Sequence, residues 1–167
     1  ATLTLTVKIA QTIAFGTLSA KTYGDAPFAA SATASSGLTP SYSIVSGPAT
    51  IGGGTVTITG TGTVTVRASQ AGNASYSAAS DVDQSFTVTK AVLTVTADAK
   101  SRAYGAANPT LSATITGYVN SETGAVVSGA AALSIAATAT TAVGSASITA
   151  GVGTLAATNY NFSPVNG

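Results

Sequence analysis

Residues 55–68 read Thr-Val-Thr-Ile-Thr-Gly-Thr-Gly-Thr-Val-Thr-Val-Arg-Ala, with alternating threonine and apolar residues on both sides of a Gly-Thr-Gly sequence. An alternation of period two places the apolar side chains on one face of an extended strand and the threonines on the other. Valine and isoleucine favour strands, and closely spaced glycines favour turns. The stretch therefore predicts two half-buried strands around a turn at residues 60–62.

The same pattern recurs along the chain, at residues 2–7, 86–88 and 93–96. Glycine-containing turns are expected at residues 52–54, 71–73, 128–129 and 151–153. The alanine-rich stretch 130–139 is assigned to a strand or an irregular edge, because serine, threonine and Ile135 interrupt it. We therefore expect an all-β chain, with a core built from the inward positions Ile13, Phe15, Ile44, Ile51, Ile58, Val64, Val66, Phe86, Val88, Leu93, Val95, Leu111, Ile115, Leu133, Ile135, Ile148, Leu155 and Phe162.

The sequence also repeats itself. Tyr23-Gly24 recurs as Tyr104-Gly105, and Tyr76 recurs as Tyr160. Leu5–Ala10 resembles Phe86–Ala91 at nearly the same spacing. Three landmarks at one spacing indicate a tandem duplication of about 80 residues. About seven short strands fit a module of this size, as in a small immunoglobulin-like (Ig-like) sandwich.

The predicted fold is therefore two tandem Ig-like antiparallel β-sandwiches. Residues 9–89 form the first repeat, and residues 90–167 form the second. Residues 1–8 match the end of the first repeat, so we assign them to the closing strand of an upstream repeat or to a leader. By the same match, we expect the second repeat to lack its own closing strand, which leaves an open sheet edge.

The composition argues against several kinds of function. The sequence has no cysteine and no histidine, which excludes disulfides, thiol chemistry and the commonest general base near neutral pH. Only 7% of the residues are charged and the net charge is +1, so no basic patch is available for nucleic acid. No apolar run approaches the roughly 20 residues needed to span a bilayer. We expect no enzymatic activity, no cofactor, no nucleic-acid partner and no membrane span in this sequence.

Three aspartates are weak candidates for a metal site. Asp81 and Asp83 lie on the same face of an extended segment, and Asp98 lies shortly after the boundary between the repeats. Their oxygens suit Ca²⁺. The simpler interpretation is that they are surface acids that keep the sheets soluble and their edges unpaired. We therefore predict no required metal, with Asp81, Asp83 and Asp98 as the ligands if one binds.

Tyrosines and lysines offer two further possibilities. A ring at Tyr23 or Tyr104 would be able to stack on a sugar, but packing at the edge of the sandwich with a bonded hydroxyl is the expected role, as it is for Tyr76 and Tyr160.

A Lys–Asn isopeptide crosslink would need a buried lysine, asparagine and acid. Its candidate residues are Lys8, Lys90 and Asn73.

Several motifs occur in a recognisable order. The second half contains Lys90–Ala97, Tyr104-Gly105 with Asn108-Pro109, Gly117–Val119, Ser128-Gly129, Ala142–Gly144 and Asn159–Phe162. In this order they resemble the MBG group, the "mostly bacterial Ig-like" modules of large bacterial surface proteins. The first half is similar to a sister form, through Gln11–Phe15, Tyr23–Phe28 and Ala71–Tyr76. The resemblance implies an extracellular array, often in adhesins, and implies no catalytic or binding residues.

The expected function is that of a structural spacer in a secreted bacterial cell-surface protein, extending a functional tip in adhesion. The short connection Thr89-Lys90-Ala91 favours limited swivelling between the repeats. The alternative is an adhesin module that binds a glycan or a host protein through loops at a sandwich end. The expected partners are neighbouring repeats of the parent chain. Strand pairing between copies, head to tail, is a further hypothesis, in which residues 2–7 fill the open edge of the second repeat.

Overall fold

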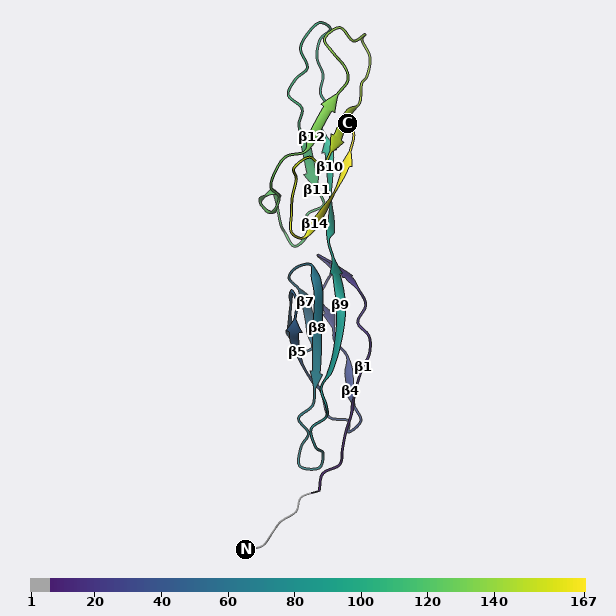
Figure 1. The fold of residues 1–167 in the computed structure, drawn as a ribbon, viewed down its shortest axis with the longest axis vertical. Helices are drawn as coiled ribbons and strands as arrows, with labels where there is room; N and C mark the ends of the chain where they lie inside the picture. The colour runs from purple at the N-terminus through teal and green to yellow at the C-terminus, as the bar shows by residue number, and fades with distance from the viewer. Residues whose placement is uncertain (1–6) are drawn as a thin grey trace. The chain divides into compact units, whose positions relative to one another are not determined.

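The computed structural model describes residues 7–167, which form β-strands, turns and one short 3-10 helix, without an α-helix among them (Figure 1). The chain divides into two compact units, one ending at Thr89 and the other running from Lys90 to Gly167. The expectation of an all-β chain is confirmed, and the arrangement of several sheets is consistent with a β-sandwich. The strand expected at residues 2–7 lies outside the described residues except for Val7, which is in no strand and is 83% exposed.

The larger sheet of the first unit has four strands, in the order β2 (Lys21–Thr22), β9 (Val82–Thr89), β8 (Gly62–Ser69) and β5 (Ser41–Ser46). β2 runs parallel to β9, and the other neighbours are antiparallel. The outward positions of β8 and β9 are polar. Thr65 lies opposite Ser85 with hydroxyl oxygens 2.8 Å apart, and Arg67 lies opposite Asp83.

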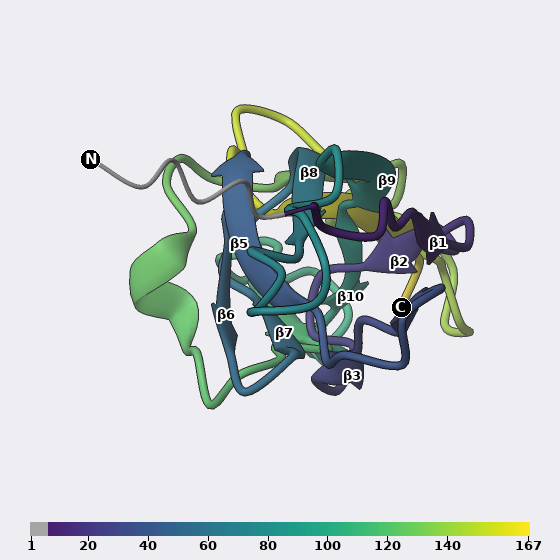
Figure 2. The same ribbon diagram turned by 90° about the horizontal axis from the view of Figure 1, so that it is seen from below.

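The remaining strands of the first unit form a three-stranded sheet and a separate pair. The three-stranded sheet has the order β3 (Phe28–Ala29), β7 (Thr55–Ile58) and β6 (Ala49–Gly52), and the pair joins β1 (Ile13–Phe15) to β4 (Ala32–Ala34). Figure 2 shows β6, β7 and β3 on the opposite side of the unit from β8 and β9. The two strands expected within residues 55–68 are therefore present. They belong to different sheets, because the chain crosses from one layer to the other between them.

The core of the first unit lies between these layers. Its largest fully buried side chains are Val56 from one layer and Val64 and Val66 from the other. The rings of Phe28 and Phe86 meet edge to face, with centroids 5.3 Å apart. The other expected core positions are buried (Phe15, Ile58, Val88) or half-buried (Ile13, Ile44, Ile51).

The second unit contains a three-stranded sheet and a two-stranded sheet. The first has the order β11 (Ala113–Thr116), β10 (Ala91–Ala97) and β14 (Tyr160–Val165), and the second joins β12 (Ala132–Ile135) to β13 (Ile148–Gly151). β14 is parallel to β10, and a 3-10 turn, η1 (Gly124–Val126), lies between β11 and β12. Because β12 lies within residues 130–139, the strand expected there is confirmed.

The core of the second unit is centred on β10. Leu93 and Val95 are completely buried, and Ile148 and Tyr160 are nearly so. The remaining expected core positions are only half-buried: Leu111, Ile115, Leu133, Ile135, Leu155 and Phe162. The second unit therefore buries its apolar side chains less completely than the first.

Strand pairing follows the sequence repeat. The pair Ile13↔Ala34 of β1 and β4 recurs as the pair Val95↔Ile115 of β10 and β11. The parallel bridge Ile9↔Tyr76 recurs as Ala91↔Tyr160. In both cases the second pair follows the first at the spacing of the tandem duplication. The duplicated segments thus make corresponding backbone contacts in both units.

In the part of the chain that the structure describes, no helix is long and apolar enough to cross a membrane.

Candidate functional site

The second unit contains a cavity of about 670 Å³. Two long loops line it, one between β10 and β11 (residues 99–111) and one between β12 and β13 (residues 137–147), together with Ile135, Ile148 and Gly167. Leu111, Ile135 and Ile148 are its larger aliphatic side chains, and Lys100, Arg102 and Asn108 are the larger polar ones.

Arg102 holds the two loops together. Its Nε donates to Asn108 Oδ1 at 2.8 Å, and its Nη1 donates to the carbonyls of Ala106 and Ala139 at 3.2 and 3.5 Å. Its Nη2 donates to the carbonyl of Thr138. Asn108 Nδ2 in turn donates to the carbonyl of Ala137 at 2.7 Å. These donors bind loop carbonyls, so their observed role is to shape the cavity wall.

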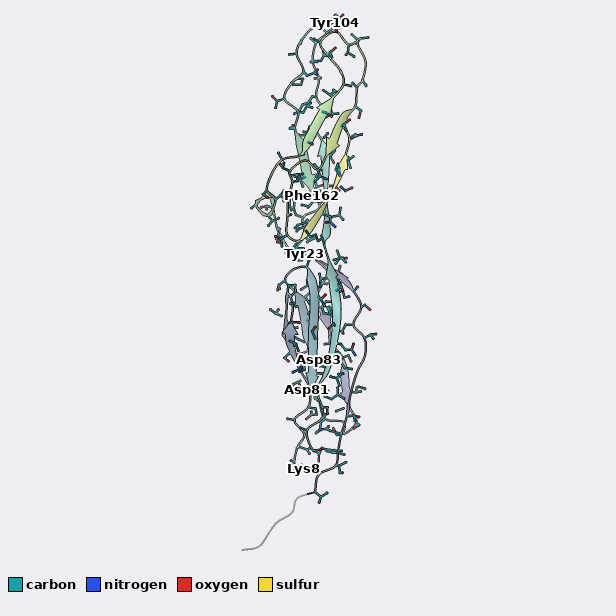
Figure 3. The ribbon with its side chains drawn as sticks, viewed as in Figure 1. Lys8, Tyr23, Asp81, Asp83, Tyr104 and Phe162 are labelled. Atoms are coloured by element: carbon teal, nitrogen blue, oxygen red, sulfur yellow. The ribbon has the colours of Figure 1, made fainter. Side chains whose placement is uncertain are left out.

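Tyr104 was expected to pack at the sandwich edge, and this prediction is wrong. Its side chain is 67% exposed at the end of the second unit, whereas Tyr23, at the matching position of the repeat, is only 6% exposed (Figure 3). Val143, on the other loop of the cavity, is 91% exposed. Tyr104 lines the same cavity as Leu111, Ile135 and Ile148, but its side chain stays largely exposed.

Tyr160 has the structural role that was expected of it. Its ring is buried and meets Tyr118 edge to face, with centroids 6.1 Å apart. Its hydroxyl accepts from the Val119 N–H at 3.1 Å and donates to Glu122 Oε2. Tyr76, at the matching position of the first unit, is half-buried and bridges to Ile9.

Asp81 and Asp83 lie beside Arg67 on the outer face of the first unit (Figure 3). Arg67 donates from Nε and Nη2 to the two carboxylate oxygens of Asp83, both at 2.8 Å. The hydrogen bond from Arg67 lowers the pKa of Asp83 below its ordinary value and raises the pKa of Arg67. Asp81 lies 3.7 Å from Nη1 of the same guanidinium. Arg67 thus pairs with Asp83 through two hydrogen bonds and lies within ion-pair distance of Asp81.

Asp98 belongs to the second unit and has other partners. It accepts from the hydroxyls of Ser112 at 2.6 Å and Thr114 at 2.7 Å, which lower the pKa of Asp98. Across residues 7–167, no three acidic side chains form a group that would hold a metal ion. The structure therefore does not bring Asp81, Asp83 and Asp98 together as a ligand set.

The residues considered for an isopeptide crosslink are Lys8, Lys90 and Asn73. All three are exposed, although such a crosslink needs burial. Asn73 Oδ1 accepts from the backbone N–H groups of Ser75 and Tyr76, which closes a turn. Lys90 Nζ donates to the carbonyl of Ala157 at 3.1 Å. Lys8, Lys90 and Asn73 therefore lack the burial that such a crosslink requires.

Sequence reasoning missed Arg102 and Asn108 as loop-shaping residues. Asn108 was noticed only as part of a motif, and Arg102 was not singled out. Both side chains donate to backbone carbonyls of the segment Ala137–Ala139, which is distant along the chain. No local pattern reveals such partners.

Residues 93–167 match the family model of the MBG domain (YGX type), and the matched range contains Tyr104-Gly105. Neither a curated protein nor a solved structure matches the chain.

Proposed function

We propose that the chain is a structural spacer of a bacterial surface protein, because residues 93–167 match the family model of the MBG domain (YGX type), a domain typical of repeats in such proteins. In this proposal both units are Ig-like sandwiches, they lie outside the cell, and they extend a functional tip of the parent protein. No catalytic role is included, and the loop contacts of Arg102 and Asn108 are structural.

The strand order of the first unit supports the Ig-like assignment. Ig domains of the constant type place strands C, F and G in one sheet and A, B, E and D in the other. Here β5, β8 and β9 are neighbours in one sheet, and β3, β7 and β6 are neighbours in the other. These strands correspond in chain order to C, F and G and to B, E and D. In the second unit, β10 and β11 pair as β1 and β4 do.

The observation that carries the spacer proposal is the parallel pairing of the first and last strands of the second unit. β10 pairs with β14 from Ala91↔Tyr160 to Thr96↔Val165. Tension applied at the two ends of the unit would pull these parallel strands in opposite directions along their length. The hydrogen bonds between them, which lie across the pulling direction, would then be loaded together rather than one after another. A spacer under tension benefits from this geometry.

The connection between the units also suits a spacer. Lys90 is the only residue between β9 and β10. So short a connection has few free backbone angles, unlike a flexible glycine- and serine-rich linker.

A single-molecule pulling experiment on the whole chain tests this function. The sequence has no cysteine, so attachment points can be introduced at will. One variant carries Lys90→Cys and a cysteine added after Gly167, which shears β10 against β14. The control carries Lys90→Cys and Thr158→Cys, which attaches both handles at the same end of the strand pair and peels it open.

Both variants share the Lys90 substitution, and Thr158 is exposed, so they should differ little in thermodynamic stability. We expect an unfolding force several-fold higher in shear than in peeling. Equal forces in the two directions would show that the strand pair does not resist tension, and the spacer proposal would lose its main support.

The exposed ring of Tyr104 favours a second candidate, a module that binds a glycan at its loop end. Aromatic rings accept sugars by stacking, and a 67% exposed tyrosine on a loop is accessible for this. A glycan array probed with the chain and with Tyr104→Ala tests it. Binding that Tyr104→Ala abolishes would favour this candidate, and an array without signal would reject it for the glycans displayed.

A further inference from the structure

The sequence contains two tripeptides of the form Asn-X-Ser/Thr in which X is not proline. They are Asn73-Ala74-Ser75 and Asn161-Phe162-Ser163, while Asn108-Pro109-Thr110 has the excluded proline. Such a tripeptide is the acceptor for an N-linked sugar, which is joined to the amide nitrogen of the asparagine. A transferase has to reach the whole tripeptide, so the local structure around each asparagine decides which of the two is available.

Asn73 lies in an exposed turn of the first unit. The turn belongs to the segment 70–81 between β8 and β9, which forms no strand, and Asn73, Ala74 and Ser75 are all exposed. β9 begins after this segment and ends at Thr89. The turn therefore lies at the end of the first unit that is away from the connection to the second.

The side-chain amide of Asn73 is held by its oxygen alone. Oδ1 accepts from the backbone N–H groups of Ser75 at 2.8 Å and Tyr76 at 2.9 Å. Within residues 7–167, neither Nδ2 of Asn73 nor the hydroxyl of Ser75 makes a hydrogen bond. The nitrogen that would receive a sugar and the hydroxyl that completes the motif can therefore meet a transferase without breaking these contacts.

Close backbone packing fixes the turn that presents Asn73. Gly72 has a φ of +75°, and a Cβ at this position would lie 2.4 Å from the carbonyl oxygen of Tyr76. The Gly72 N–H donates to Gln70 Oε1 at 2.7 Å, and the Asn73 N–H donates to the Tyr76 carbonyl at 3.0 Å. The acceptor asparagine is thus presented from a constrained turn.

Asn161 is in the opposite situation. It lies within β14, where Asn161 pairs with Val92 and Ser163 pairs with Thr94 of β10. Phe162, between them, is half-buried. A transferase that binds the tripeptide along its backbone would have to separate β14 from β10. The fold therefore withholds the second tripeptide while it presents the first.

We propose that Asn73 is an acceptor for an N-linked sugar, that the donor is a sugar diphosphate, and that Asn161 is not modified in the folded chain. In the transfer, Asn73 Nδ2 forms a bond to the anomeric carbon of the sugar as the bond from that carbon to the diphosphate oxygen breaks. The diphosphate leaves with the electron pair of the broken bond, and the amide gives one proton to a base of the transferase. No oxidant or reductant is needed.

A sugar at Asn73 would add a bulky, hydrated group to a chain in which only 7% of the residues are charged. Because Nδ2 of Asn73 has no partner in the described part of the chain, its attachment would leave the hydrogen bonds of the turn intact. The modification is independent of resistance to tension in the second unit, so either proposal can fail without the other.

Transfer to the folded chain tests the proposal. The whole chain is incubated with UDP-glucose and a transferase that modifies Asn-X-Ser/Thr, and the product is mapped by mass spectrometry of its peptides. Synthetic peptides of residues 70–78 and 158–166 are treated in parallel. The yield at each asparagine in the folded chain is divided by the yield in its own peptide, so that differences in local sequence cancel.

Ser75→Ala and Ser75→Thr are the matched variants. Both keep Asn73 and the backbone N–H groups that bond to its Oδ1, so both keep the turn, which circular dichroism and thermal melting verify. We expect a ratio near one at Asn73 and a ratio several-fold lower at Asn161. Transfer to Asn73 should be lost in Ser75→Ala and retained in Ser75→Thr.

The parent protein, isolated from the cells that make it, should carry a sugar on the peptide that contains Asn73 and none on the peptide that contains Asn161. Three results would overturn the proposal: a ratio at Asn73 no higher than that at Asn161, transfer to Asn73 that survives Ser75→Ala, or an Asn73 that is unmodified in the parent protein.

Discussion

Phe15 and Phe162 were both expected to point inward, but their surroundings differ. Phe15 is 6% exposed and meets Tyr42 edge to face, with ring centroids 6.0 Å apart, whereas Phe162 is only half-buried. Truncating a buried phenylalanine removes its transfer free energy and leaves a cavity, at a cost of about 3–5 kcal/mol. A half-buried ring leaves a smaller cavity that water can reach.

We therefore predict that Phe15→Ala lowers the free energy of unfolding of the first unit by about 3–5 kcal/mol. Phe162→Ala should cost the second unit clearly less. Denaturant unfolding of the two variants, followed by tyrosine fluorescence and circular dichroism, measures both values. Equal costs would mean that Phe162 is as well packed as Phe15.

Asp98 makes the stability of the second unit depend on acid. The hydroxyls of Ser112 and Thr114 stabilise its carboxylate and hold the pKa of Asp98 below the model-compound value of 3.8. A carboxyl group whose pKa is lowered by folding stabilises the folded state above its unfolded pKa. That contribution is lost as the pH falls from about 3.8 through the lower pKa of the folded state.

We predict that Asp98→Asn destabilises the second unit at pH 7 and flattens the loss of stability between about pH 5 and pH 2, relative to the unmodified chain. Ser112→Ala/Thr114→Val keeps the carboxylate but removes its donors, so it should flatten the same profile. Unfolding titrations at a series of pH values measure the effect. A profile of unchanged steepness in both variants would assign the acid sensitivity to other groups.

At the scale of the element, the turns of the second unit depend on glycine for two separable reasons. Gly105 and Gly129 have φ values of +83° and +80°, a region in which residues with a Cβ are strained. A Cβ on Gly105 would meet nothing within 4 Å, whereas a Cβ on Gly129 would collide with the carbonyl oxygen of Thr154. The turn before β12 thus needs glycine for close backbone approach as well as for its φ.

We predict that Gly105→Ala costs about 1–2 kcal/mol, the strain of the left-handed conformation alone. Gly129→Ala should cost more, because the backbone around Thr154 must also move. Since the φ values of Gly105 and Gly129 nearly match, the difference in destabilisation between the two variants measures the effect of the close backbone approach. Thermal and denaturant unfolding of both variants measure this difference. Equal losses of stability would show that the backbone around Thr154 moves away at little cost.

β14 shows how an edge strand tolerates proline. The Ala91 N–H donates to the Asn159 carbonyl at 3.0 Å. In the parallel pairing of β14 with β10, this bond shows that the odd-numbered residues of β14 are the ones that bond to β10. In a parallel ladder, every second residue of an edge strand donates its backbone N–H to the neighbouring strand. In β14 these donors begin at Asn161 and are odd-numbered, so Pro164 is not one of them. Pro164, paired with Val95, therefore occupies a position whose missing N–H would not have bonded to β10.

At the scale of the whole molecule, each unit has its own buried side chains, centred on Val64 and Val66 in the first and on Leu93 and Val95 in the second. We predict two separate unfolding transitions in calorimetry, with the second unit melting first because more of its core positions are only half-buried. Phe15→Ala should shift one transition alone. A single transition that moves as a whole in that variant would mean that the units fold cooperatively.

The placement of the acids leads to a prediction about calcium. Asp83 is hydrogen-bonded to Arg67, Asp81 lies near the same guanidinium, and Asp98 accepts from two hydroxyls, so all three carboxylates have partners within the protein. We predict that melting temperatures in calcium and in chelator agree within a degree or two. A rise of many degrees with calcium, abolished by Asp98→Asn or Asp83→Asn, would identify a site that these partners conceal.

The sequence by itself determined the all-β class, the strands around Val56 and Val64, the turn positions and the tandem repeat. These features are readable because alternation, glycine spacing and duplication are local properties of the chain. The MBG resemblance, confirmed for residues 93–167, rested on the order of short motifs and needed no coordinates.

Only the tertiary structure decided which side chains meet. The assignment of Thr55–Ile58 and Gly62–Ser69 to different sheets, the exposure of Tyr104 and the contacts of Arg102 with the second loop all depend on long-range packing. Two copies of one motif, Tyr23-Gly24 and Tyr104-Gly105, differ in burial. Whether a ring is covered depends on segments far away in the chain, and a local pattern carries no information about them.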